Sequence, residues 1–306
     1  MVPRVRRWLV HAVLLSLAPI LAGVILCEIT LHVPPQFRQR PSAGAAPELA
    51  SATDAGWEEV AIKAGDGVRL DAWFFQPRAW NGRGVVLLHG IGNRREGMRH
   101  HAALFLRNGY AVLVPDSRGH GSSGGGVISF GIRETDDLRR WLDWLGSAKK
   151  LPHVYALGQS MGAAILLQSL PGEPRIRATV AEASFRAFSD IAYDRLAGRA
   201  YLGISAGRFL FWPVVEPGLL WARLRYGLDL RNVSPFDSLG RSSTPVLLIH
   251  GSEDRNILPW HSRALYAANP GAAVLWEVPG AGHVTILFQH PQEYERRVVS
   301  WFQSHP

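Results

Sequence analysis

A serine stands between two glycines in the stretch YALGQSMGAA, which runs from Tyr155 to Ala164. Gly158 and Gly162 lie two residues before and two residues after Ser160, where an apolar run meets a run of small residues. Glycine lets a strand turn sharply into a helix without a side-chain clash, so close packing alone would explain both positions. The same Gly-x-Ser-x-Gly spacing is typical of a turn that displays a serine as a nucleophile. The second interpretation predicts that the rest of the chain supplies the partners of a reactive serine.

An acid and a histidine follow Ser160 in the order that such a turn requires. A serine hydroxyl is a poor nucleophile near neutral pH unless a base takes its proton and a carboxylate orients that base. The stretch LLIHGSEDRNI places Asp254 on the loop after one predicted strand, and VPGAGH places His283 after the next. The carboxyl ends of parallel strands meet at one edge of a sheet. We therefore expect Ser160, Asp254 and His283 to form a catalytic triad, in the chain order serine, acid, histidine.

Backbone N–H groups for an oxyanion can be placed as well. One donor is expected from the residue after the serine, Met161, and the other from the loop after an earlier strand. That loop is HGIGNRRE, in which Ile91 is the expected second donor and Gly92 keeps the backbone close to a substrate. The oxyanion hole is thus predicted at Ile91 and Met161.

Two other carboxylates lie at predicted strand ends. Glu182 is the alternative partner for the histidine, but Asp254 is favoured because its loop directly precedes the strand that leads to His283. Asp116 in DSRGHGSSGG comes before Ser160 in the chain. We expect it to organise its loop through hydrogen bonds from its side chain to the backbone.

Seven other histidines are expected to have no chemical role. Those that follow strands and have glycine neighbours fit turns or packing: His89, His120 and His250. Those with no pattern are expected at the surface: His100, His101, His261 and His290.

The elements that position these residues alternate between strand and helix. Two alternating stretches in 57–77, joined by Gly65-Asp66-Gly67, predict a β-hairpin. Strands are then expected at 84–90, 110–116, 153–158, 176–184, 244–251 and 272–280, and helices at 97–107, 132–145, 161–170, 259–268 and 291–302. The strands are continuous apolar runs, which is typical of a parallel sheet covered on both faces. The prediction is an α/β fold with a mostly parallel central sheet.

The alternation stops over residues 185–241. This stretch is apolar and aromatic, with Phe209, Phe211, Trp212, Trp221 and Tyr226. It is longer than a crossover needs, and we expect a helical cap inserted over the edge of the sheet where ligands of open α/β sheets bind. For each aromatic residue taken singly, ordinary core packing in a helical pair is the favoured interpretation. The folded domain is expected at 57–306, preceded by a Pro-, Ala-, Gly- and Ser-rich linker at 33–56.

Residues 1–32 are expected to anchor the chain in a membrane. Trp8–Cys27 holds 20 residues without Asp, Glu, Lys or Arg, enough for a helix to cross the roughly 30 Å of a bilayer core. A cleaved signal peptide is less consistent, because small-x-small cleavage sites occur only far downstream, near Ala43–Ala46. Arg4, Arg6 and Arg7 precede the apolar stretch and favour a cytoplasmic N-terminus, with the domain on the outer, periplasmic or extracytoplasmic side.

Composition narrows the function classes. The 306 residues are 47% hydrophobic, enough for one sizeable core, and the single cysteine rules out an internal disulfide and a cysteine-based metal site. The formal net charge is +8, but the arginines are scattered among acids rather than clustered with stacking aromatics, so nucleic-acid binding is not expected. No metal or nucleotide motif is visible, and we expect no cofactor.

From 57 to 301 the chain resembles the α/β-hydrolase superfamily, and more narrowly the membrane-anchored serine hydrolases related to BEM46-like and ABHD13-like proteins. The motifs that carry the resemblance are HGIGNRREGM, DSRGHGSSGG, GQSMGAA, SPFDSL, TPVLLIHGSEDRNILP and VPGAGH. The resemblance implies Ser160 as nucleophile, Asp254 as acid, His283 as base, and Ile91 with Met161 as oxyanion donors. The 185–241 insertion matches the variable cap only loosely, and this leaves the substrate open.

The expected function is a serine hydrolase that cleaves carboxylic esters or thioesters through an acyl-enzyme. The substrate is expected to be a small ester or lipid-like molecule near a bilayer. Two alternatives stay open: amide or peptide hydrolysis by the same triad, and a membrane-tethered protein of the same fold that binds a ligand without turnover. The sequence does not determine the oligomeric state.

Overall fold

A computed structural model describes the backbone of residues 2–199 and 204–306, and the side chains of 16–198 and 206–306. The chain forms two compact units. The larger unit consists of 33–187 and 234–306; the smaller one combines the N-terminal helix, up to residue 32, with 188–233. The predicted triad and oxyanion residues all belong to the larger unit.

The larger unit is built on one eight-stranded sheet in the order β1-β2-β4-β3-β5-β6-β7-β8. Antiparallel pairing is confined to β1 with β2 and β2 with β4, whereas the remaining neighbours are parallel. The strands are β1 (Ala55–Lys63), β2 (Arg69–Pro77), β3 (Gly84–Leu88), β4 (Ala111–Pro115), β5 (Val154–Gln159), β6 (Ile176–Glu182), β7 (Val246–Gly251) and β8 (Ala273–Val278). The predicted hairpin and the run of buried parallel strands are both present.

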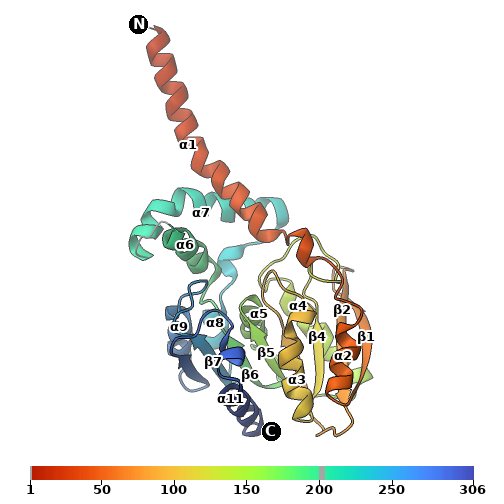
Figure 1. The fold of residues 1–306 in the computed structure, drawn as a ribbon. Coiled ribbons are helices and arrows are strands. Elements are labelled where there is room, and N and C mark those ends of the chain that lie inside the picture. The colour runs from red at the N-terminus through yellow and green to blue at the C-terminus, as the bar shows by residue number, and fades with distance from the viewer. Residues whose placement is uncertain (1, 200–203) are drawn as a thin grey trace. The chain divides into compact units, whose positions relative to one another are not determined.

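Helices cover both faces of this sheet (Figure 1). On one face lie α2 (Ala45–Ala52), α3 (Arg99–Arg107) and α11 (Pro291–Gln303). On the other lie α4 (Glu134–Ala148), α5 (Met161–Ser169), α8 (Pro235–Gly240) and α9 (Trp260–Ala268). The short elements η1 (Pro35–Phe37), η2 (Arg95–Met98) and α10 (Ile286–Gln289) lie in the connections.

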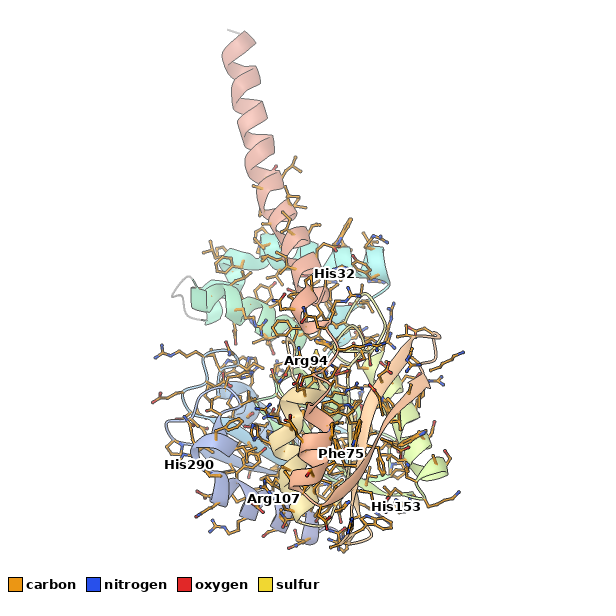
Figure 2. The ribbon with its side chains drawn as sticks, turned by 45° about the vertical axis from the view of Figure 1, so that its right-hand side comes forward. His32, Phe75, Arg94, Arg107, His153 and His290 are labelled. Carbon is orange, nitrogen blue, oxygen red and sulfur yellow. The ribbon has the colours of Figure 1, made fainter. Side chains whose placement is uncertain are left out.

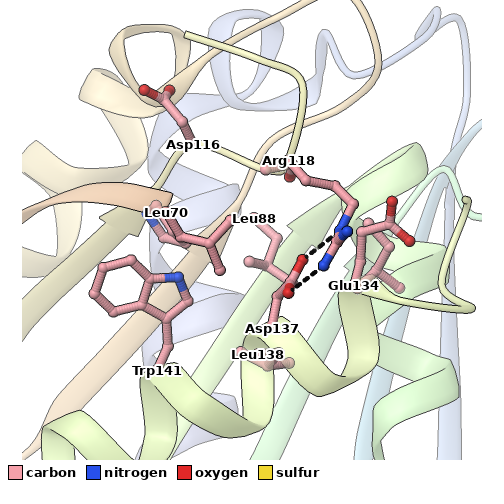
Figure 3. A pocket seen from close by; sticks show the side chains of 11 residues that line it. Leu70, Leu88, Asp116, Arg118, Glu134, Asp137, Leu138 and Trp141 are labelled. Atoms are coloured by element: carbon pink, nitrogen blue, oxygen red, sulfur yellow. Dashed lines mark hydrogen bonds and ion pairs between the residues drawn. The ribbon is translucent and has the colours of Figure 1, made fainter. Parts of the chain in front are cut away.

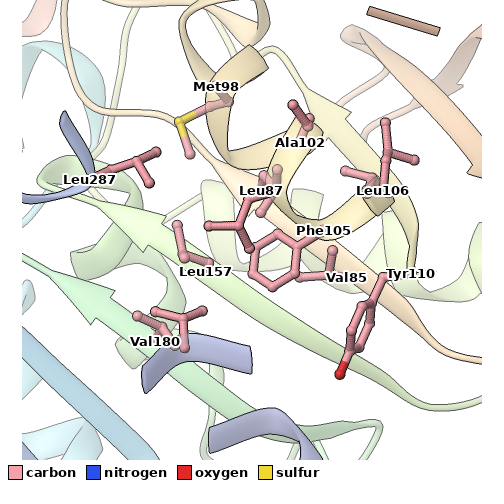
Figure 4. Close-up of a cluster of buried hydrophobic side chains, with 14 of the residues drawn as sticks. Val85, Leu87, Met98, Ala102, Phe105, Leu106, Tyr110, Leu157, Val180 and Leu287 are labelled. Atoms are coloured by element: carbon pink, nitrogen blue, oxygen red, sulfur yellow. The ribbon is translucent and has the colours of Figure 1, made fainter. Parts of the chain in front are cut away.

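Alternate residues of the strands supply the core beneath α2, α3 and α11. Val85 and Leu87 of β3 point into this cluster together with residues of the neighbouring strands (Figure 4). Phe302 of α11 stacks on Tyr155 of β5, with ring centroids 4.6 Å apart, and on Phe105 of α3 at 5.5 Å. Successive side chains of each strand pack on alternate faces, so a register shift of one residue would move this set to the other face of the sheet. The loops at the carboxyl ends of the strands are therefore held in place relative to one another.

The stretch 33–56 is not a simple linker, so this expectation was wrong for its second half. Residues 45–52 form α2, which buries Ala45, Ala46, Leu49 and Ala50 in the core. These positions lie on one side of a helix, since i, i+1, i+4 and i+5 share a face. Their small size concealed the stripe, because an alanine-rich stretch with Pro, Gly and Ser nearby also has the composition of a linker.

The smaller unit is helical. It contains α1 (Val2–Leu31), α6 (Phe188–Arg199), α7 (Ile204–Tyr226) and η3 (Leu230–Asn232). Within it α1 packs against α7, and α6 also packs against α7. By length and composition α1 could cross a membrane, and its candidate span among the described side chains is Ser16–Phe37.

Candidate active site

Ser160 occupies a strained turn between a strand and a helix. β5 ends at Gln159 and α5 begins at Met161, and the serine between them has φ 54° and ψ −116°. A residue with a Cβ rarely adopts such a positive φ, which costs of order 1–3 kcal/mol and persists only where the surrounding structure enforces it. The strain is therefore an observation that points to function at Ser160.

The two flanking glycines are required by close backbone packing. A Cβ on Gly158 would lie 2.5 Å from the carbonyl oxygen of Gly162, and a Cβ on Gly162 would lie 2.3 Å from the carbonyl oxygen of Leu88. No residue with a Cβ fits at such distances. The packing explanation and the serine-displaying explanation therefore describe one turn, because the close approach is what allows the chain to reverse around Ser160.

The structure brings Ser160, His283 and Asp254 together. His283 lies after β8, with its Nε2 3.1 Å from Ser160 Oγ and its Nδ1 2.6 Å from Asp254 Oδ2. A carboxylate only accepts hydrogen bonds, so Nδ1 carries the proton and donates it to Asp254. The lone pair on Nε2 is then directed at the Ser160 hydroxyl. This arrangement can withdraw the serine proton during attack on a carbonyl.

Asp254 is buried and held by several donors. Its Oδ1 accepts hydrogen bonds from the backbone N–H groups of Asn256 (2.8 Å) and Ile257 (3.0 Å). Burial by itself raises the pKa of this carboxyl, but the hydrogen bonds of His250 and His283, the charge of His283 and the Ile257 N–H together outweigh burial. The pKa of Asp254 consequently lies well below its ordinary value, and the side chain is ionised throughout the neutral range.

His250, at the end of β7, lies directly behind Asp254. Its Nε2 is 2.8 Å from the carbonyl oxygen of Ile257 and 3.4 Å from Asp254 Oδ2. Because both neighbours only accept, Nε2 carries the proton, and Nδ1 accepts from the Ser262 hydroxyl at 2.6 Å. The sequence predicts only a turn or packing role for His250 and not this support of the loop of Asp254. Its position at a strand end, four residues before Asp254, is the sequence feature that could have indicated this role.

The loop after β3 lies against the serine. A Cβ on Gly90 would lie 3.1 Å from Ser160 Cβ, so Ile91 follows a residue that leaves little room beside the serine. His89 holds this loop: its Nδ1 donates to the Gly90 carbonyl oxygen (2.8 Å), and its Nε2 accepts the Ser117 N–H (3.0 Å). Burial lowers the pKa of His89 to about 4, so the ring is neutral at physiological pH and both hydrogen bonds persist.

Glu182 lies beneath the turn and bonds to other groups. Its Oε2 accepts from Gln159 Nε2 (2.8 Å) and the Tyr294 hydroxyl (3.0 Å), and its backbone oxygen accepts the Ser160 N–H (2.8 Å). Burial raises the pKa of the Glu182 carboxyl. Since His283 Nδ1 is directed to Asp254, the geometry separates the two candidate carboxylates: Asp254 orients the histidine, and Glu182 supports the turn from below.

Two histidines expected at the surface are buried, and this expectation was wrong. His101 on α3 lies with its Nε2 3.3 Å from Gln159 Nε2, and His261 on α9 accepts the Arg186 N–H through Nδ1 at 3.1 Å. Both sit on the inward faces of short amphipathic helices, and one nitrogen of each ring has the hydrogen-bond partner given above. His100 and His290 are exposed, and His290 lies at the periphery of the molecule in Figure 2.

Asp116, after β4, organises two loops as expected. Its Oδ1 accepts the Arg95 N–H (2.7 Å) and its Oδ2 the Ser122 N–H (2.9 Å). Burial raises the pKa of Asp116 to about 6, and the charge of Arg95 opposes this rise.

A pocket beside Asp116 is distinct from the triad. It is lined by Leu70, Leu88, Arg118, Asp137, Trp141 and their neighbours (Figure 3). Arg118 spans it with a paired hydrogen bond to Asp137, at 2.7 and 2.6 Å. The Arg118 guanidinium is therefore paired with a carboxylate of the fold. Among the side chains of 16–198 and 206–306, no group of three or more His, Cys, Asp or Glu could hold a metal ion.

Comparison with known proteins agrees with this architecture. The sequence profile of the Alpha/beta hydrolase family matches residues 85–297. The chain is 27% identical to the uncharacterized protein YqkD of Bacillus subtilis over 223 residues, covering 72% of this chain and 71% of YqkD. It is 24% identical to the alpha/beta hydrolase domain-containing protein WAV2 of Arabidopsis thaliana over 261 residues, covering 81% and 79% of the two chains.

Solved structures show the same fold. The esterase Pf2001 of Pyrococcus furiosus superposes with a TM-score of 0.70 at 23% identity, covering 89% of this chain and 99% of the esterase. A hydrolase of Pseudomonas aeruginosa superposes with a TM-score of 0.60 at 19% identity, over 80% and 98% of the two chains. The predicted fold, a mostly parallel sheet with helices on both faces, is confirmed.

Proposed function

Because the chain belongs to the alpha/beta hydrolase family, we propose that it is a serine hydrolase that cleaves carboxylic esters or thioesters. One observation carries the proposal: the continuous hydrogen-bonded path from Ser160 Oγ through His283 to Asp254, with distances of 3.1 and 2.6 Å. The strained backbone at Ser160 supports it, because strain of this kind is concentrated at functional sites.

The proposed reaction has two steps. His283 Nε2 takes the Ser160 proton while Oγ attacks the carbonyl carbon, and the tetrahedral intermediate collapses as His283 returns the proton to the departing alcohol or thiol. Water then attacks the acyl-enzyme, with the same imidazole as base, and releases the acid. Asp254 keeps the proton on Nδ1 throughout and stabilises the imidazolium. The backbone N–H groups of Met161 and Ile91 are the proposed donors to the oxyanion, each worth about 10²–10³-fold in kcat.

We further propose that α1 anchors the enzyme in a membrane, as in the group of BEM46-like and ABHD13-like hydrolases. The length and apolar composition of α1 support the anchor, and the three arginines before the apolar stretch favour a cytoplasmic N-terminus with the catalytic unit outside. The proposed substrates are small esters or lipid-like molecules that reach the site from the bilayer or its surface.

Labelling of the full chain in detergent with a fluorophosphonate probe tests the proposal without a choice of substrate. Wild type should be labelled, and Ser160→Ala and His283→Ala should not. Ser169→Ala on the same helix is the matched control, because Ser169 is also buried but bonds to the Ile165 carbonyl oxygen at 2.8 Å. A folded wild-type protein that resists the probe would favour ligand binding without turnover. Labelling followed by preferential cleavage of amides over matched esters would favour the amidase alternative.

A further inference from the structure

Helices α1 and α7 of the smaller unit approach each other through glycine. A Cβ on Gly23 of α1 would lie 2.0 Å from the Val214 carbonyl oxygen, and a Cβ on Gly218 of α7 would lie 2.7 Å from the Gly23 carbonyl oxygen. The two backbones therefore touch at a point where neither helix can carry a side chain. Small residues at helix crossings are typical of packing inside membranes, where close van der Waals contact replaces the hydrophobic effect.

A polar contact fixes the same pair one turn further along. Glu28 of α1 accepts hydrogen bonds from Trp221 Nε1 (2.5 Å) and from the Tyr226 hydroxyl (2.7 Å), both on α7. Glu28 is the first charged residue after the apolar stretch Trp8–Cys27. If that stretch spans the bilayer, α7 crosses α1 where the helix leaves the hydrocarbon core. Tryptophan and tyrosine are enriched at this depth because their rings are apolar and their polar tips remain hydrated.

The side of α7 that faces away from α1 is apolar and exposed. At 3.6 residues per turn, four of the exposed apolar side chains lie in one stripe opposite Gly218: Phe209, Trp212, Leu220 and Leu224. Leu210 is also exposed but lies outside this stripe. Phe209 is 83% exposed and Leu224 74%. The acid in this stripe, Glu216, is paired with Arg231 at 2.6 Å and accepts from the Tyr193 hydroxyl at 2.9 Å. Large exposed apolar side chains grouped in this way mark an interaction surface.

The surroundings of the stripe favour lipid as its partner. Exposed apolar side chains also line α1 in the same unit: Leu17, Ile20, Leu21, Ile25 and Ile29. Three arginines of α7 lie near these side chains: Arg208 is paired with Asp190, Arg223 falls within the stripe 3.8 Å from Asp229, and Arg225 lies at the end of the helix. The exposed apolar stripe and the arginines near it favour a position of α7 in the interface plane, with the apolar side chains among acyl chains and the arginines near anionic headgroups.

We propose that α7 is a second membrane-binding element, an interfacial helix whose stripe Phe209, Trp212, Leu220 and Leu224 inserts into an anionic phospholipid bilayer beside α1. The proposal rests on the proposed membrane anchor and is independent of the hydrolase chemistry. It gives the insertion a role beyond covering a substrate: the chain meets the bilayer at two places, which restricts its rotation about the anchor.

The test uses the full chain with Cys27→Ala, which removes the single native cysteine. Single cysteines replace Phe209 and Leu224 on the stripe, Leu21 on α1, and Phe288 in the larger unit as a matched control. Phe288 is 61% exposed and Leu21 60%. Each cysteine carries the environment-sensitive fluorophore NBD, in vesicles of phosphatidylcholine and phosphatidylglycerol. A urea unfolding curve reports on the fold of each variant, and Leu220→Cys replaces any stripe variant that does not fold. Fluorophosphonate labelling of Ser160 is recorded separately.

The expected result is a blue-shifted emission at both stripe positions, with loss of emission when lipids carry a nitroxide quencher and resistance to aqueous iodide. The Phe288 position should show the opposite behaviour. If the stripe behaves like Phe288 while Leu21 is quenched by the lipids, interfacial insertion is overturned and the anchor stands. If iodide quenches the fluorophore at Leu21 as well as at the stripe, and lipid nitroxides quench neither, both the anchor and this proposal fail. This conclusion does not depend on whether Ser160 is labelled by the fluorophosphonate.

Discussion

Replacing Asp254 by asparagine tests the proposed relay with a change of one atom. The Oδ1 position accepts the N–H groups of Asn256 and Ile257, so an asparagine must keep its carbonyl oxygen there. Its NH2 group then points to His283, where the carboxylate oxygen had been 2.6 Å from Nδ1. An amide donor at this place forces Nδ1 to accept. The His283 proton consequently moves to Nε2, and the ring can no longer take the proton of Ser160.

The expected loss follows from the wrong tautomer rather than from lost folding. The analogous change in a serine protease triad lowers kcat by about 10⁴, which corresponds to about 5.5 kcal/mol at 1.36 kcal/mol per tenfold. We therefore expect kcat/KM of Asp254→Asn on a p-nitrophenyl ester to fall by about 10⁴. The measurement is steady-state hydrolysis by the full chain in detergent, beside a urea unfolding curve of each variant.

Glu182→Gln is the matched control, since it makes the same carboxylate-to-amide change at another strand end. Glu182 bonds Gln159 and Tyr294, so its replacement should disturb the turn without changing the His283 tautomer. We expect its effect on kcat/KM to be far smaller than that of Asp254→Asn. If Asp254→Asn kept a tenth or more of the activity while Glu182→Gln removed it, Glu182 would be the operative acid and the tautomer argument would be refuted.

Three further outcomes follow from the site and its surroundings. The reaction needs a neutral His283 and an ionised Asp254 whose pKa is already lowered, so kcat/KM should fall at acid pH, where a protonated imidazole cannot act as base; a profile that stays flat as the pH is lowered would contradict the base assignment. The pKa of His89 is lowered from 6.5 to about 4. The unfolded chain therefore binds a proton there below about pH 6.5 while the folded one does not. The free energy of unfolding should decrease as pH falls from 6.5 to 4, by up to about 3 kcal/mol from this ring. Urea unfolding curves at pH 7 and 5 should show a smaller decrease for His89→Gln than for wild type. An equal decrease in the two proteins would count against the burial argument. Gly158→Ala should lower the free energy of unfolding by about 1–3 kcal/mol, since its Cβ would lie 2.5 Å from a backbone oxygen. Gly146→Ala on α4 is the control: a Cβ there meets nothing within 4 Å, so this variant should gain up to about 1 kcal/mol of stability. Similar unfolding midpoints for the two variants would show that the turn relaxes around the added methyl group.

Local patterns fail where burial depends on partners distant in sequence. Periodicity alone predicted no helix at 45–52 and placed His101 and His261 at the surface. Ala45 and Leu49 are buried because the sheet lies beneath them, and His101 is buried because Gln159 and Tyr294 meet it there. A short alanine-rich helix such as α2 has too weak an apolar stripe to indicate burial from its own composition.

The sequence by itself determined the fold class and the residues with the right chemistry. Apolar runs of strand length and the glycines around Ser160 are local properties, and the chain order of Ser160, Asp254 and His283 can be read directly. Only the tertiary structure shows which carboxylate faces His283. It also shows that the backbone of Ser160 is strained and that His250 lies behind Asp254. These depend on distances between loops that follow β5, β6, β7 and β8. Sheet pairing sets such distances, because it brings together residues more than a hundred positions apart in the chain, such as Ser160 and His283.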